Sequence, residues 1–128
     1  MSTRILFIED DIGVVESVRF ALSFYWPEAE LVPAFLGQCG LELARTGNID
    51  IVVLDLGLPD IDGFEVLSEI HKTSSVPVII LSGRIEEDIG KTVLALGAHA
   101  CMFKPFKHKE LIGCIKTHLG IFTTANRH

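Results

Sequence analysis

The sequence predicts one domain of the α/β class, in which a five-stranded parallel sheet lies between two layers of helices. Two observations lead to this prediction. Five short apolar runs alternate along the 128 residues with five stretches of helical periodicity, and a regular strand–helix alternation is typical of a parallel sheet. In addition, the runs at 51–54 and 78–81 are continuous and rich in β-branched residues, as strands covered on both faces are.

The five expected strands are the apolar runs themselves, at residues 5–8, 31–35, 51–54, 78–81 and 100–103. Pro33 interrupts the second run, and a proline has no N–H to donate to a ladder. We therefore expect the second strand to lie at an edge of the sheet.

A helix is expected after each strand, because apolar residues recur there at helical spacing and a stop or start signal bounds each stretch. The stretches are 14–24 before Trp26, 36–44 before Gly47, 64–70 after Gly63, 85–96 before Gly97 and 111–119 before Gly120. Right-handed crossovers between parallel strands then place helices on both faces of the sheet.

The composition excludes several classes of protein. A hydrophobic fraction of 48% and a net charge of −6 indicate a globular chain that does not bind nucleic acid directly. No apolar run approaches the roughly 20 residues of a membrane span. Three cysteines, Cys39, Cys101 and Cys114, have no metal-ligand spacing, so we expect buried, reduced thiols and a cytoplasmic protein.

Polar residues follow four of the five runs, and ligands of open α/β sheets bind at these carboxyl ends of the strands. Carboxylates gathered there repel one another, by roughly 4 kcal/mol for two charges about 4 Å apart near the surface, and Mg²⁺ is the hard cation that such oxygens hold. A carboxylate beside Mg²⁺ can act as a nucleophile and form an aspartyl phosphate. The polar residues that follow these four runs are Glu9, Asp10, Asp55, Ser82 and Lys104.

Residues 4 to about 119 resemble the receiver domain of two-component response regulators. Four segments carry the resemblance, each at the spacing of that family. They are Ile5-Leu6-Phe7-Ile8-Glu9-Asp10-Asp11, Val52-Val53-Leu54-Asp55-Leu56-Gly57-Leu58-Pro59-Asp60-Ile61-Asp62-Gly63, Val76-Pro77-Val78-Ile79-Ile80-Leu81-Ser82-Gly83, and Gly97-Ala98 with Lys104-Pro105-Phe106. The resemblance implies a flavodoxin-like, doubly wound sheet with strand order 2-1-3-4-5.

The resemblance also implies roles for the residues at the strand ends. Asp55 is expected to accept a phosphoryl group from the phosphohistidine of a histidine kinase. Mg²⁺ is expected on Glu9, Asp10, Asp55 and the backbone carbonyl of Gly57. Ser82 and Lys104 are expected to bind phosphoryl oxygens. Asp11 is expected to cap a helix, and the Lys104–Pro105 bond is expected to be cis.

The partners implied by the resemblance are a sensor histidine kinase or phosphotransfer protein, and an output domain or downstream protein. The output partner is expected on the face made by the fourth helix, fifth strand and fifth helix. No membrane contact and no enzymatic turnover are expected, beyond the domain's own phosphorylation and dephosphorylation. We assign residues 1–121 to the receiver domain and 122–128 to a tail or the start of a linker.

Some positions depart from the family pattern. Cys101 stands where the fifth strand usually carries an aromatic switch residue, and Phe103 does not simply replace it. His99, Ala100 and Cys114 stand where many family members carry charges for a salt-bridged dimer. Only Lys91 and Glu110 fit that pattern.

In the family that the chain resembles, the positions two residues after the phosphoacceptor and two residues after the hydroxyl residue control how water reaches the acyl phosphate. Gly57 offers no side chain as a shield, whereas Arg84 can reach over the phosphate.

Two alternatives compete with this interpretation. A haloacid-dehalogenase-like phosphatase needs a second aspartate two residues after its nucleophile, and that place is Gly57, which argues against a turnover enzyme. The other alternative is a pseudo-receiver, an interaction module that acts without phosphorylation. Such modules usually lack the acceptor, an acid or the lysine, and all of these are present here.

Overall fold

A computed structural model describes residues 2–83 and 87–121 of the chain. Five parallel strands form one sheet in the order β2-β1-β3-β4-β5, which confirms the predicted topology. The strands are β1 (Arg4–Ile8), β2 (Glu30–Ala34), β3 (Ile51–Asp55), β4 (Val78–Ser82) and β5 (Ala100–Phe103). The helices are α1 (Ile12–Tyr25), α2 (Gly37–Thr46), α3 (Gly63–Thr73), α4 (Glu87–Ala95) and α5 (His108–His118).

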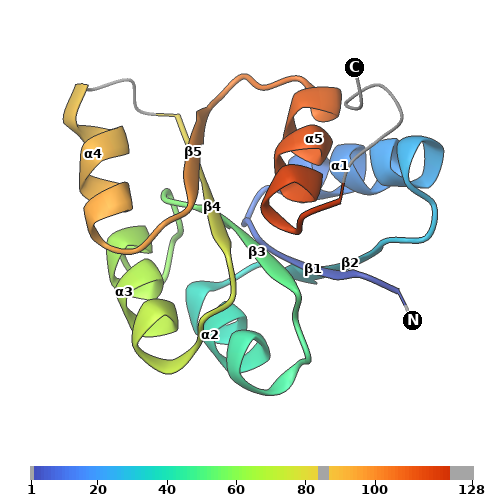
Figure 1. The fold of residues 1–128 in the computed structure, drawn as a ribbon. Helices are drawn as coiled ribbons and strands as arrows, with labels where there is room; N and C mark the ends of the chain where they lie inside the picture. The colour runs from blue at the N-terminus through green and yellow to red at the C-terminus, as the bar shows by residue number, and fades with distance from the viewer. Residues whose placement is uncertain (1, 84–86, 122–128) are drawn as a thin grey trace.

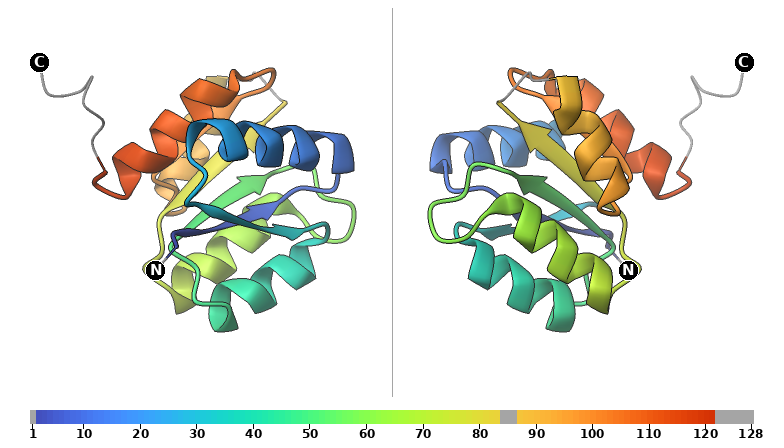
Figure 2. Two further views of the ribbon diagram at one scale, coloured as in Figure 1. Left: turned by 90° about the vertical axis from the view of Figure 1, so that its right-hand side faces the viewer. Right: turned by 90° about the vertical axis from the view of Figure 1, so that its left-hand side faces the viewer.

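The helices form two layers, one on each face of the sheet. In Figure 1, α1 and α5 lie on one side and α2, α3 and α4 on the other, and the side views in Figure 2 show α1 and α5 above the sheet and α2 and α3 below it. The buried side chains divide in the same way. One cluster joins Phe7 and Val53 to Val18 of α1 and Ile115 of α5, and the other joins Leu54 to helices of the opposite layer.

The central strands match their sequence pattern most closely. Every residue of β3 and of β4 is buried, as expected for continuous apolar strands covered on both faces. Pro33 lies in β2, at the edge of the sheet and in register with Phe7 of β1. The edge position predicted from this proline is therefore confirmed.

Two local predictions are also confirmed. The side chain of Asp11 accepts hydrogen bonds from the backbone N–H groups of Gly13 and Val14 and so caps α1. The Lys104–Pro105 peptide bond is cis.

The expectation of buried thiols is wrong for Cys39, which is exposed on α2, while Cys101 and Cys114 are half-buried. Among the helices of residues 2–83 and 87–121, none is long and apolar enough to cross a membrane.

The fold brings the predicted site residues to one edge of the sheet. Glu9 directly follows β1, Asp55 ends β3, Ser82 ends β4 and Lys104 directly follows β5. Because all the strands are parallel, their carboxyl ends lie at the same edge.

Candidate functional site

Two carboxylates and a hydroxyl are buried at the carboxyl edge of the sheet. The exposed fraction is 1% for Glu9, 5% for Asp55 and 1% for Ser82. Each of these three residues ends or directly follows a strand of apolar residues, and its position at the buried end of that strand shields its polar group from water. Burial of a charged group is costly unless it has partners, so their environment decides their chemistry.

Three carboxylates meet at this point. Glu9, Asp10 and Asp55 each offer an oxygen, and these oxygens all lie within 4.8 Å of one another. Asp10 is exposed, whereas the other two are buried. At such separations the repulsion between ionised carboxylates is large, and a cation among them would relieve it.

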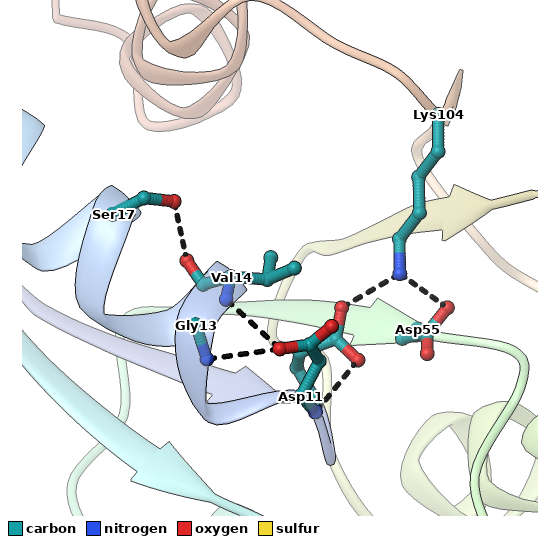
Figure 3. A network of polar contacts seen from close by, with 7 residues as sticks. Asp11, Gly13, Val14, Ser17, Asp55 and Lys104 are labelled. Atoms are coloured by element: carbon teal, nitrogen blue, oxygen red, sulfur yellow. Dashed lines mark hydrogen bonds and ion pairs between the residues drawn. The ribbon is translucent and has the colours of Figure 1, made fainter.

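Lys104 supplies positive charge to the two buried carboxylates. Its Nζ donates to Glu9 Oε1 at 2.7 Å and lies 3.4 Å from Asp55 Oδ1. Figure 3 shows the side chain extending from the end of β5 across to Asp55 at the end of β3. The sequence separation of 95 residues between Lys104 and Glu9 shows that only the assembled sheet makes this contact.

The electrostatics of Glu9 and Lys104 reflect this environment. Burial raises the pKa of Glu9 to about 7, and the neighbouring carboxylate of Asp55 adds to the rise, while Lys104 opposes it. Burial alone would lower the pKa of Lys104, but the hydrogen bond to Glu9 and the charge of Asp55 outweigh that effect and raise it. Near neutral pH, Glu9 is therefore close to the boundary between its neutral and ionised forms.

The donor set fits a small, hard cation. Carboxylate and carbonyl oxygens with room for water are the ligands that Mg²⁺ takes in proteins, and three carboxylates are in place. The backbone at Gly57 comes close as well, because a Cβ built there would lie 3.7 Å from Asp55 Oδ2. These residues are the ones that could hold a metal ion.

An open cleft lies next to the carboxylates. Its volume is about 550 Å³, which is ample for a phosphoryl group and its water. The lining residues are Asp55, Leu56, Gly57, Leu58, Asp62, Ser82, Gly83 and Lys104. All of the predicted reactive residues except Glu9 and Asp10 therefore face this cleft.

Sequence reasoning did not single out Asp62 as a cleft residue. Its side chain accepts a hydrogen bond from Phe64 N at 2.9 Å and caps α3. The Asp-Gly pair before an apolar helix is a capping signal, but it does not reveal that the same aspartate lines the cleft.

The fifth strand places two side chains beside β4. Cys101 is in register with Ile80 and Phe103 with Ser82, and Cys101 packs against the cluster under α2, α3 and α4. Phe103 is 41% exposed, and whether it can take the role of the aromatic residue that the family pattern places at Cys101 stays a prediction. Arg84, the other residue predicted to act at the site, lies outside the described residues.

The strand order 2-1-3-4-5 and the acid cluster at the carboxyl edge define a CheY-like α/β domain. The model of the response regulator receiver domain family matches residues 5–116, and the chain belongs to this family. Among solved structures, it is similar to a CheY-like receiver domain protein from Methanospirillum hungatei JF-1. The TM-score is 0.86 at 27% identity, with 94% of this chain and 95% of that one covered.

Two curated relatives are longer than this chain. The chain is 36% identical over 128 residues to the regulatory protein VanRc of Enterococcus gallinarum, covering 98% of this chain and 54% of the relative. It is 35% identical over 113 residues to the cell cycle response regulator CtrA of Brucella ovis, covering 88% and 48%. The chain thus spans about half the length of the curated relatives it matches.

Proposed function

We propose that this chain is the phosphoacceptor domain of a two-component pathway and that Asp55 takes up the phosphoryl group. The observation that carries the proposal is the position of Asp55. It is buried at the end of β3, beside Glu9 and Asp10 and 3.4 Å from the ammonium of Lys104, and it borders an open cleft. Membership of the receiver family supports the same role.

The chemistry is a transfer of the phosphoryl group from a histidine nitrogen to a carboxylate oxygen. One oxygen of Asp55 attacks phosphorus, the P–N bond of the donor phosphohistidine breaks, and the histidine nitrogen keeps the electron pair. A Mg²⁺ ion on Glu9, Asp10, Asp55 and the Gly57 carbonyl would neutralise charge on the phosphoryl oxygens. Lys104 adds a fixed positive charge, and Ser82 offers a hydroxyl donor.

The donor would be a sensor histidine kinase or a phosphotransfer protein, as membership of the family implies. For the output partner we propose the face of α4, β5 and α5. Two large apolar side chains are exposed there, Leu94 on α4 and Phe103 on β5.

We take residues 1–121 as the receiver unit, and residues 122–128 lie outside the described residues. The free cysteines support placement in the cytoplasm.

Mass spectrometry tests the proposal directly. Incubation with acetyl phosphate and Mg²⁺ should add about 80 Da, the mass of one phosphoryl group, and chelation of the metal should prevent it. Asp55→Asn should show no addition, whereas Asp50→Asn, a change of the same kind at the opposite edge of the sheet, should react normally. No mass shift in the wild-type protein would contradict the proposal and favour a pseudo-receiver.

A further inference from the structure

The first turn of α2 has no capping group of its own. The residue before it is Leu36, whose side chain makes no cap hydrogen bond. The first N–H groups of any helix have no partner within the helix and must find one elsewhere. In α2 the partner comes from a distant part of the chain.

Asp60 supplies the missing cap. Its Oδ1 accepts a hydrogen bond from Gly37 N at 2.8 Å, and its Oδ2 accepts one from Gln38 N at 3.0 Å. These backbone hydrogen bonds lower the pKa of Asp60, so its carboxylate stays ionised at neutral pH. Both oxygens of one carboxylate therefore tie the segment after β3 to the start of α2.

Close packing strengthens this connection. A Cβ on Gly37 would lie 2.7 Å from Cγ1 of Ile61, so the helix approaches the segment this closely only because residue 37 is a glycine. At the other end of the segment, a Cβ on Gly63 would lie 2.5 Å from the Cα of Leu56. Residues 56–62 are thus held near both of their ends.

The segment 56–62 carries the backbone that approaches Asp55. Gly57 lies in it, and a Cβ built there would be 3.7 Å from Asp55 Oδ2. Gly57 has no side chain to anchor it and is exposed. Its position therefore depends on how firmly the rest of the segment is held.

We propose that Asp60 is a positioning residue that fixes residues 56–62 against α2 and so presents the Gly57 carbonyl to the metal ion. The metal-binding part of this inference rests on the proposed function. Asp60 is not among the residues that line the cleft; it acts through the backbone of the segment.

Magnesium binding is the first test. In Asp60→Ala, the Kd for Mg²⁺ measured by calorimetry should rise about tenfold, the lower end of the losses seen when a group that supports a metal ligand is removed. Asp60→Asn keeps one good acceptor oxygen and should recover part of the affinity. The matched control is Asp50→Ala, because Asp50 is also exposed and also accepts a backbone N–H, from Arg4 at 2.7 Å, but lies away from the site.

A second measurement separates this inference from the proposed function. In metal-free protein, the ¹⁵N order parameters of Gly57 and Leu58 should fall in Asp60→Ala from values near those of rigid backbone, about 0.85, and stay unchanged in Asp50→Ala. Wild-type Mg²⁺ affinity in Asp60→Ala, or unchanged order parameters in folded Asp60→Asn and Asp60→Ala, would overturn the inference. Failure of the wild-type protein to bind Mg²⁺ would instead contradict the proposed function, and the order parameters would still decide whether Asp60 holds the segment.

Discussion

The centre and the edge of the sheet contribute differently to the site. The central strands β1 and β3 are buried almost throughout; Glu9 directly follows β1, and Asp55 ends β3. The edge strand β5 is only half-buried and ends in the exposed Phe103. Interiors as closely packed as the centre hold groups in fixed positions, whereas a half-buried edge can shift at lower cost. If the proposed function holds, the centre of the sheet should fix the reactive carboxylates and the edge strand β5 should be the part that responds.

The largest expected effect lies in the central strand. Leu54→Ala, at a fully buried position beside Asp55, should lower the free energy of unfolding by about 3 kcal/mol, because it opens a cavity in a close-packed core. Met102→Ala on β5 should cost clearly less. Urea denaturation of both variants measures this, and equal losses would contradict the division between centre and edge.

A slightly smaller effect is expected from Lys104, which follows the edge strand β5 but contacts the carboxylates at the ends of the central strands. Lys104→Ala removes the ammonium that contacts both Glu9 and Asp55, and phosphorylation by acetyl phosphate should slow by about 100-fold, as when one charge-stabilising donor is lost. The control is Lys109→Ala, whose ammonium lies 5.6 Å from the centre of the Tyr25 ring, outside the site. A wild-type rate in Lys104→Ala would show that the contact has no catalytic part.

The free energy of unfolding of the metal-free protein should depend on pH because of Glu9 alone. Because its pKa rises from 4.5 to about 7 on folding, the folded protein holds a proton that the unfolded chain releases. The stability of the metal-free protein should therefore fall as pH rises from about 5 to 7.

The same proton should compete with the metal ion. The apparent Kd for Mg²⁺ should rise about fivefold from pH 7 to pH 6, because the ligand must be ionised to bind and a carboxyl with a pKa of about 7 loses about four fifths of its ionised form over that range. Chemical denaturation and calorimetry across this range measure the two effects. If Glu9→Gln shows the same slopes as the wild-type protein, another group is responsible.

The smallest effect is expected at the exposed end of β5. Phe103→Ala should change the free energy of unfolding by less than about 1 kcal/mol, because the ring is 41% exposed. Its rate of phosphorylation should match that of the wild-type protein. A slowed rate, seen by mass spectrometry, would place Phe103 with the chemistry and not with the response.

The sequence predicted those features that depend on short-range pattern. The parallel sheet followed from the alternation of runs, its strand order followed from the family resemblance, and the edge position of β2 followed from Pro33. The clustering of Glu9, Asp55 and Lys104 followed from a rule about strand ends, which needs no knowledge of individual contacts.

Other features depend on contacts that no local pattern records. Asp60 caps a helix that begins 23 residues earlier in the chain, and its position after a strand gives no sign of this. The exposure of Cys39 on α2 depends on which way the helix is turned against the sheet, and thiols alone do not indicate it.

Pro33 also has a consequence for contacts between molecules. Glu30 N donates to Thr3 O and Ala34 O accepts from Glu9 N, so the even-numbered residues of β2 direct their polar groups toward β1. In a parallel strand the backbone groups of residue 33 then face away from the sheet, where a row of unpaired donors and acceptors could template the addition of a foreign strand. Proline removes one donor from that row, and the outer margin of the sheet is therefore a weaker template for an added strand.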